Sequence, residues 1–304
     1  SSREVAYTNK QAGVFYTETN GEHRSSWQGW RIMSTEMMED YSITVDDRRL
    51  NKKDAIAKIY PHQIIREYPD GLEERVTLLD SIDAIVVELS NVGGKEISIA
   101  PFFTDSQNPD DYELGFEGNV LLTARKRHLE RTQNENYPVW IGITVVPGDK
   151  LNSIRSSDTL NTAFSPVNCQ WSIVNRQLKI IFVAGDTKSQ TISLAKHIAQ
   201  NYSSLIEKRK KRMEDLLNYS YVRTNNKRFD KALYWAKISM DALIMNQRGK
   251  GIFAGLPWFD NYWGRDSFIS LAGATLVTGN FKDAKEILKS FAAWQDTNPN
   301  STNY

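Results

Sequence analysis

The sequence is poor in cysteine, in net charge and in long apolar runs. Cys169 is the only cysteine among 304 residues, which excludes an internal disulfide framework and a cysteine-based metal site. The 38 Lys and Arg residues nearly balance the 37 Asp and Glu residues. The chain therefore lacks the long-range field that attracts nucleic acid or an anionic membrane. No apolar run approaches the roughly 20 residues of a membrane span. These absences favour a neutral partner.

The start of the sequence leaves the cellular compartment open. "SSREVAYTNK" has no initiating Met and no apolar segment of the signal-peptide kind. A cleaved export signal and a trimmed N-terminus explain this start equally well. Both a cytoplasmic and a periplasmic location remain compatible with the sequence.

Most catalytic and metal-binding motifs are missing. The sequence contains no H-E-x-x-H, no Walker loop and no G-x-S-x-G. "GKGIFAG" has the wrong glycine spacing for a dinucleotide site and is interpreted as a flexible loop. The histidines are scattered singly, which is unlike a metal site: they are His23, His62, His128 and His197. We predict no metal and no cofactor.

Up to about Gly185 the sequence is typical of antiparallel sheets, and this half is predicted to be a β-sandwich. Its segments are short, β-branched and aromatic, and Gly, Pro, Asn and Asp interrupt them repeatedly. "YPDG" (68–71) is a turn signal, because Pro fixes φ and Gly accepts a positive φ. The predicted strands are 64–67, 72–79, 84–89, 96–103, 139–146, 170–174 and 178–184.

After Gly185 the apolar period changes from two to 3.6 residues, which predicts helices. The first carries a stripe from Leu194 to Leu217. The second covers about 227–245, is capped by Gly249 and has a predicted inward stripe of Phe229, Leu233, Ala236, Met240 and Leu243. The third covers 266–277 and the fourth 281–295, with Phe281, Ala284, Ile287, Leu288 and Phe291 as its stripe, before a polar tail "DTNPNSTNY". Four helices joined by short loops suggest a bundle or toroid that is incomplete.

A basic run, "EKRKKR" (207–212), lies in the first of these helices. It would suit phosphates, but no aromatic residues interleave with it and the total charge is balanced. We interpret it as a solvated helix face.

One loop concentrates aromatic and charged residues just before the third helix. "PWFDNYWGRD" (257–266) places Trp258 and Trp263 beside Arg265 and Asp266. Aromatic faces can lie against the C–H faces of a sugar, while Arg and a carboxylate hold its hydroxyl groups. Two explanations stand at this point. The loop forms a sugar pocket, or the Trp residues pack between helices and Arg265 pairs with Asp266 at a helix start.

The same loop opens a longer stretch that resembles a known family. "GLPWFDNYWGRDSFISLAGATLVTGNFKDAKEIL" is similar to the start of the catalytic domain of amylo-α-1,6-glucosidases, the glucosidase component of glycogen debranching enzymes. The usual pattern there is "PWF…WGRD…I…GLLLVTGR…EA". Upstream, "REYPDGLEERVTLLDSIDAIVVELSN" resembles, less specifically, the N-terminal sandwich of these enzymes and of glucoamylases.

The resemblance implies a three-part architecture and a truncated chain. Residues 1–186 would form an N-terminal β-supersandwich, 187–225 a helical linker and 226–304 the start of an (α/α)6 catalytic barrel. The remainder of that barrel would be its partner, and the chain, which ends at Tyr304, would be a fragment of a longer enzyme.

The resemblance also implies roles for the loop residues. Arg265 and Asp266 would grip hydroxyl groups of the terminal glucose, with Trp263 and Trp258 as ring contacts. The catalytic acid and base come from later barrel helices in the family. We expect both downstream of Tyr304, so no catalytic residue is assigned in this chain.

The expected substrate is an α-glucan oligosaccharide with α-1,6 branch points. The alternatives are a glucosidase of another linkage preference and a non-catalytic module that binds glucan or a partner chain.

Overall fold

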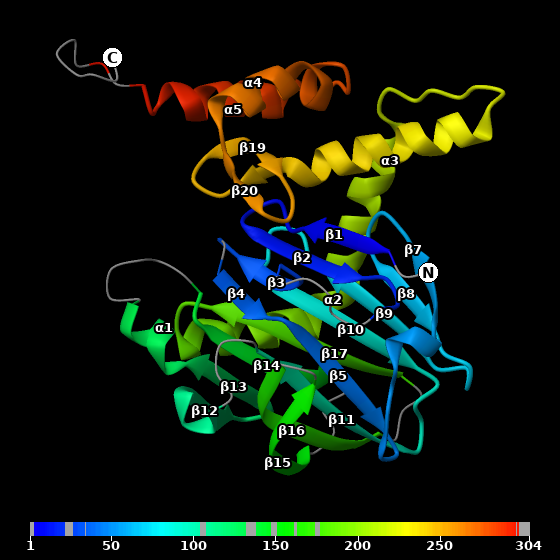
Figure 1. Cartoon of the computed structure of the whole chain (residues 1–304), viewed down its shortest axis with the longest axis vertical. Helices are drawn as coiled ribbons and strands as arrows, with labels where there is room; N and C mark the ends of the chain where they lie inside the picture. Colours follow the sequence, from blue (N-terminus) through cyan, green and yellow to red (C-terminus); the bar gives the residue numbers. More distant parts are fainter. Residues whose placement is uncertain are drawn as a thin grey trace.

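The computed structural model places strands first and helices second along the chain (Figure 1). This order confirms the predicted sandwich followed by helices. The described residues are 3–21, 27–33, 35–103, 108–131, 138–146, 151–160, 163–173, 177–295 and 297. The polar tail predicted for residues 296–304 lies, apart from Thr297, outside them.

Tyr304, which marks the point beyond which the catalytic acid and base are expected, is therefore also outside the described residues. The expectation of later barrel helices beyond Tyr304 stays a prediction.

An antiparallel sheet of eight strands is the largest element within the described residues. Its predicted hairpin forms: Gly71 has a φ of 80°, and its N–H donates to the Tyr68 carbonyl over 3.0 Å. In spatial order the strands are β12 (Tyr112–Glu117), β13 (Val120–Arg125), β14 (Trp140–Val146), β17 (Gln177–Gly185), β10 (Ala84–Ser90), β9 (Glu73–Leu78), β8 (Ile64–Glu67) and β7 (Ile56–Ile59).

A five-stranded sheet and a four-stranded sheet complete the β part. The first comprises β15 (Leu151–Leu160), β16 (Ala163–Ile173), β11 (Lys95–Phe102), β5 (Asp40–Val45) and β6 (Arg48–Arg49). The second comprises β1 (Glu4–Thr8), β2 (Gly13–Glu18), β3 (Gly29–Ile32) and β4 (Thr35–Met38). The predicted strand 170–174 is the end of β16, although Val174 lies outside the described residues. A 3₁₀ turn (η1, Lys52–Asp54) precedes β7, another (η2, Pro109–Asp111) precedes β12, and α1 (Lys126–Arg131) follows β13.

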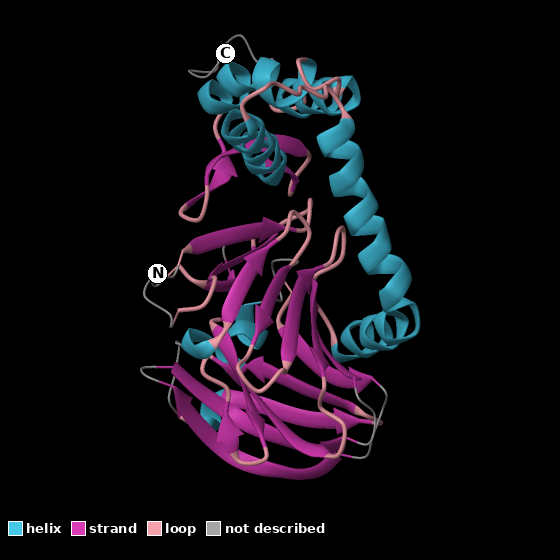
Figure 2. Ribbon diagram, turned by 90° about the vertical axis from the view of Figure 1, so that its right-hand side faces the viewer, coloured by secondary structure: helices cyan, strands magenta, loops and turns pink. Residues whose placement is uncertain are grey.

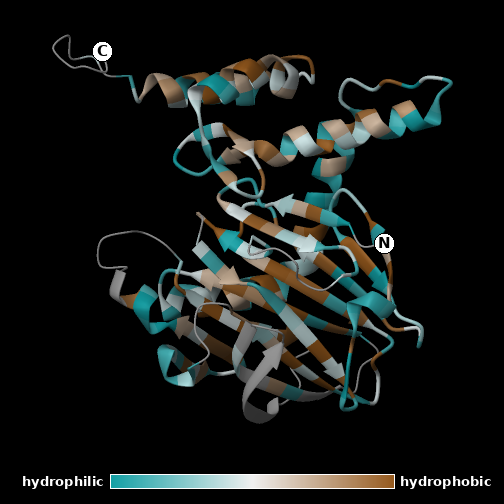
Figure 3. Ribbon diagram, viewed as in Figure 1, coloured by the Kyte–Doolittle hydropathy of each residue, from teal (hydrophilic) through white to brown (hydrophobic). Residues whose placement is uncertain are grey.

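The core of the sandwich follows from the two-residue period of its strands. In β10, Ile85 and Val87 point into the space between the large sheets, whereas Ala84 and Val86 point to the opposite face. Residues of β5, β9, β11 and β17 fill the same inner layer, and the rings of Tyr41 and Phe182 lie 5.6 Å apart. Figure 3 shows the hydrophobic residues running along these strands.

Helix α2 (Lys188–Asn218) covers the outer face of the large sheet and then continues to the helical part (Figure 2). Ile192, Ala195 and Ile198 pack against that face. Thr187 caps the helix, because its side chain accepts from the Gln190 N–H.

The basic run of α2 differs in part from the solvated face that its sequence predicts. A solvated face was expected, but the Arg209 side chain is only 1% exposed. Its guanidinium donates to the carbonyls of Thr8 and His62 and pairs with Asp80. The run crosses the edge of the sandwich, where buried carbonyls and one carboxylate require donors.

The second helix, α3 (Lys227–Leu243), also differs from its prediction. Its buried residues are Asp230, Lys237 and Asp241, whereas Phe229 and Ala236 of the predicted inward stripe are exposed. The side chain of Lys237 donates to the Leu217 and Tyr219 carbonyls at the end of α2. Polar contacts to the preceding segments therefore decide which side of α3 is buried.

Two predictions for the segment after α3 are wrong. Helix α3 ends at Leu243, and Gly249, with a φ of 87°, lies in a hairpin turn and is not a helix cap. "GKGIFAG" is no flexible loop. Most of it forms β19 (Lys250–Gly255), the central strand of a small sheet with β18 (Ile244–Asn246) and β20 (Phe259–Tyr262).

The last helices are α4 (Gly264–Leu271), which continues as a π-helical segment η3 (Ala272–Leu276), and α5 (Phe281–Ala292). Gly279, with a φ of 74°, lies in the turn between them. In α5 Ala284 and Ile287 of the predicted stripe are buried, but Phe281 and Leu288 are exposed.

Candidate functional site

The small sheet β18–β19–β20 carries the aromatic and charged loop and rests on the sandwich. Met245 of β18 and Phe253 of β19 form a buried cluster with Val14 and Tyr16 of β2. In Figure 1 β19 and β20 lie between the sandwich and the helices α4 and α5, beside one end of α3. The loop is therefore built on a rigid support.

The Tyr262 side chain links β20 to β19 and to the turn between β18 and β19. Its ring lies 5.5 Å from the Phe253 ring and closely covers Gly251, where an added Cβ would come within 2.5 Å of the ring. Its hydroxyl accepts from the Gln247 N–H over 2.9 Å and donates to the Gly249 carbonyl over 3.1 Å. Burial raises the pKa of Tyr262 to about 12, so the hydroxyl stays protonated at neutral pH.

Helix α4 begins inside the loop. Trp263 is its N-cap residue, and Ser267, which is buried, donates its hydroxyl to the Ile252 carbonyl over 3.0 Å. This bond ties the first turn of α4 to β19. The carboxylate of Asp266 lies in that first turn, where the helix dipole favours a negative charge.

The four predicted site residues lie on one short segment and are open to solvent. Trp258 is in the turn between β19 and β20 and is 52% exposed, and Trp263 is 56% exposed. Arg265 is exposed and Asp266 partly buried. Within the described part of the chain neither charge has an ion pair or a side-chain hydrogen bond, so the alternative of an Arg265–Asp266 pair does not hold.

The described residues hold no group of three or more His, Cys, Asp or Glu side chains that could ligate a metal. His62, His128 and His197 lie on separate elements, and His23 lies outside the described residues. Burial lowers the pKa of His62 to about 4, and Arg209 adds to this effect. Over the same residues, no helix has the length and apolar character of a membrane crossing.

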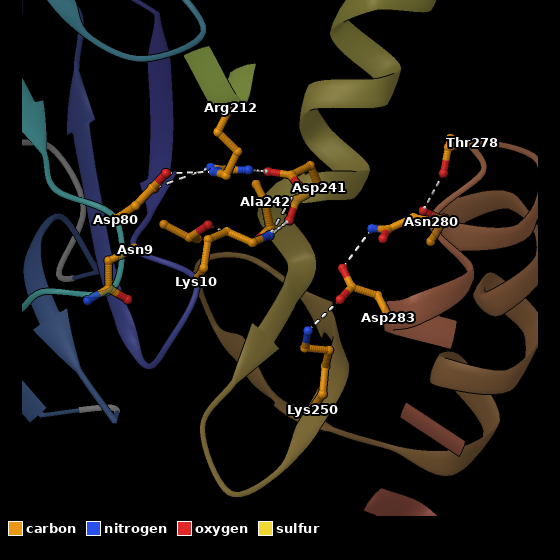
Figure 4. A network of polar contacts seen from close by, with 12 residues as sticks. Asn9, Lys10, Asp80, Arg212, Asp241, Ala242, Lys250, Thr278, Asn280 and Asp283 are labelled. Atoms are coloured by element: carbon orange, nitrogen blue, oxygen red, sulfur yellow. Dashed lines mark hydrogen bonds and ion pairs between the residues drawn. The ribbon is translucent and has the colours of Figure 1, made fainter. Parts of the chain in front are cut away.

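A polar network that sequence reasoning missed joins the sandwich, α2 and α3 (Figure 4). Arg212 donates to Asp80 over 2.6 Å and to Asp241 over 2.8 Å. The Lys10 ammonium lies 3.3 Å from the Asp241 carboxylate. Although burial alone would raise it, Lys10 and Arg212 hold the pKa of Asp241 below its usual value. The only signal in the sequence was the basic run that supplies Arg209 and Arg212.

The fold is that of glucoamylase-like glycosidases. The structure of a bacterial glucoamylase complexed with acarbose matches 96% of this chain with a TM-score of 0.58 and 14% identity. A family GH92 inverting mannosidase from Bacteroides thetaiotaomicron matches 82% of it with a TM-score of 0.51 and 12% identity. The chain spans 51% of the first of these structures and 37% of the second.

Residues 187–298 match the family model described as amylo-alpha-1,6-glucosidase. This segment contains α2, α3, the small sheet and all four predicted site residues, and it confirms the resemblance stated from the sequence. A comparison with curated proteins found no match. The helical part thus matches a glucosidase family model, and the fold resembles that of a bacterial glucoamylase.

Proposed function

We propose that this chain is the sandwich and first barrel segment of an amylo-α-1,6-glucosidase that releases glucose from α-1,6 branch points of glycogen-like oligosaccharides. One observation carries the proposal. The family match includes a rigidly mounted segment on which Trp263, Arg265 and Asp266 are exposed or partly exposed.

In this proposal the segment holds the substrate. Trp263 and Trp258 offer ring faces to the glucose, while Arg265 and Asp266 take up adjacent hydroxyl groups. Neither charge has to leave a protein partner first, because neither has one within the described residues. The bond from Ser267 to Ile252 and the anchored ring of Tyr262 fix the segment before the sugar arrives.

We infer that the catalytic carboxylates come from residues outside this chain. Hydrolysis with inversion uses one acid and one base roughly 6.5–9.5 Å apart. In the family both come from later helices, and the chain spans about half of the bacterial glucoamylase that it matches. The function therefore belongs to a longer protein that contains this segment.

The exposed apolar side chains of α4, η3 and α5 support this arrangement. Ile269 and Val277 are among the most exposed large hydrophobic residues, and Leu288 of α5 is also exposed. Surfaces of this kind mark contacts with further protein. We assign them to packing against the remaining helices of an (α/α)6 barrel.

Hydrolysis assays test the proposal directly. Isomaltose-type, panose-type and maltose-type oligosaccharides are offered to this chain and to a longer protein that contains it. We expect glucose release from α-1,6 substrates by the longer protein only. Glucose release from α-1,4 substrates alone would mean that the enzyme prefers α-1,4 linkages. Glucan binding by both proteins without hydrolysis by either would point to a binding module instead.

Asp266→Asn in the longer protein tests the role of the gripping residues. The change keeps the shape and removes the charge, so we expect kcat/KM on isomaltose-type substrates to fall roughly 10- to 100-fold. The melting temperature should fall only slightly, because Asp266 has no side-chain partner among the described residues and its favourable interaction with the dipole of α4 is worth less than about 1 kcal/mol. Glu214→Gln, an exposed carboxylate on α2, is the matched control. Unchanged kinetics in Asp266→Asn would remove Asp266 from the site.

A further inference from the structure

A cavity lies at the junction of the sandwich, α2, α3 and α5. It has a volume of about 610 Å³. The strand loops contribute Lys10 and Asp80, α2 contributes Arg212, the residue after it Tyr219, α3 contributes Asp241, and the turn before α5 contributes Asn280. Cavities that bind small molecules fall in the range of roughly 300–1,000 Å³. The space would accommodate one or two sugar rings.

Four of the charged side chains of this cavity hold one another in place. Asp241 is buried between Lys10 and Arg212, and Arg212 also binds Asp80 (Figure 4). Four aspartates and three basic residues line the cavity, so its charges nearly cancel. Such a lining offers both donors and acceptors in rigid positions and gives no advantage to an anion or a cation. It suits a neutral ligand with many hydroxyl groups.

Two exposed aromatic side chains complete the lining. Tyr219, just after α2, and Phe281, the first residue of α5, are 60% and 65% exposed. The Tyr219 ring rests on Gly279, where an added Cβ would come within 2.6 Å of it. This contact fixes the ring while leaving most of its surface open. Ligand pockets combine aromatic faces with a few polar groups held in fixed positions, and this lining has both.

This cavity is separate from the candidate site at Trp263. The candidate site lies at the first turn of α4, whereas Thr278 and Gly279 of the cavity follow the end of η3. A helical segment of this length, from residue 264 to 276, spans about 20 Å. The two places therefore lie at opposite ends of one helical segment, and none of the four predicted site residues lines the cavity.

We propose that this junction cavity is a second carbohydrate site, which binds a neutral mono- or disaccharide between Tyr219 and Phe281. The bound sugar contacts the sandwich, α2, α3 and α5 together, so it stabilises their arrangement. The site goes beyond the proposed function, and only the choice of α-linked glucose as the first probe rests on that function.

The experiment uses this chain with the substitutions Trp263→Ala and Asp266→Asn, called the parent. Binding at the candidate site then does not contribute. Maltose, isomaltose, cellobiose and an α-linked mannobiose are titrated by calorimetry and saturation-transfer NMR. We expect one weak binding event and a rise in melting temperature with sugar concentration. Adding Phe281→Ala or Tyr219→Ala should weaken this binding about tenfold. Tyr219→Phe keeps the ring and should retain most of it.

The control is Trp294→Ala, since Trp294 is 75% exposed beyond the end of α5 and does not line the cavity. It should leave binding unchanged. The proposal is overturned if the parent binds none of the sugars, or if Phe281→Ala and Tyr219→Ala bind them as well as the parent does. Glucose 6-phosphate and spermidine serve as an anionic and a cationic probe. Binding of only these two would also overturn the proposal. If wild type and parent bind sugar identically, the candidate site at Trp263 has failed and the junction site stands.

Discussion

The sandwich and the helical part use the same residue types in opposite ways. In the sandwich Trp30 is fully buried, and Arg66 pairs with Glu74 over 3.2 Å with both side chains 1% exposed. In the helical part Trp258 and Trp263 are more than half exposed. There Arg265 and Asp266 have no side-chain partner among the described residues.

This difference separates residues that build the fold from residues available for a ligand. A buried polar group must be paired, because an unpaired one costs free energy of folding. An exposed aromatic ring beside unpaired charges contributes little to the stability of the fold. Leaving it in solvent costs little free energy of folding. Such residues are the ones that a substrate or a neighbouring helix can use.

The largest effect that we expect comes from comparing two tryptophans. Trp30→Ala should lower the free energy of unfolding by about 4 kcal/mol, because it removes a fully buried ring from the sandwich. Trp263→Ala should change it by less than about 1 kcal/mol, because most of that ring is in solvent. Urea unfolding of both variants measures the contrast. A large drop for Trp263→Ala would identify its ring as part of the core and remove it from the sugar site.

A second, smaller contrast lies within α2. Arg209→Ala should destabilise the chain by about 3 kcal/mol, since Asp80, the buried Thr8 carbonyl and the partly buried His62 carbonyl lose a donor. Its neighbour Lys208 is exposed, and Lys208→Ala should cost no more than about 0.5 kcal/mol. Thermal unfolding of both variants checks the prediction. Equal melting temperatures would mean that the run behaves as the solvated face expected from the sequence.

Seven strands of the sandwich could be predicted from the sequence, because the preferences that form them are local. The hairpin around "YPDG" depends on Pro69 and Gly71, whose backbone preferences require no tertiary contact. Residues 64–67 were predicted as a strand and form β8 with those bounds. The segment around Trp263 was found by its resemblance, which residues 187–298 confirm. Its sugar contacts, like the division at residues 186 and 225 and the catalytic pair beyond Tyr304, remain predictions.

The burial of charged residues could not be predicted, because it depends on partners far away in the sequence. Arg209 is 129 residues from Asp80, and nothing around either residue indicates the other. For the same reason Asp241 of α3 was overlooked while apolar Phe229 was predicted to face inward. The junction cavity combines residues from Lys10 to Asp283 and has no local signature. Only the fold brings them together.

The smallest effect that we expect comes from comparing two carboxylates of the β part, Glu74 and Asp83, whose pKa values shift in opposite directions. Although burial would raise the pKa of Glu74, Arg66 and other donors keep it below its usual value. Among the described residues Asp83 has no such cation beside it. Burial raises its pKa to about 6, despite a hydrogen bond of 2.7 Å from the Asn9 amide. Folding therefore tolerates the charge of Glu74 and opposes that of Asp83.

Asp83→Asn tests this distinction through pH. Between about pH 4 and 6 the folded chain keeps the Asp83 proton while the unfolded chain releases it, so this residue lowers stability as pH rises through that range. Asn keeps the acceptor for Asn9 and cannot ionise. The variant should match wild type near pH 4 and exceed it by about 1–2 kcal/mol above pH 7. Urea unfolding at both pH values measures this, with Asp47→Asn in an exposed turn as the control. A difference that does not change with pH would mean that Asp83 is charged in the folded chain at no cost.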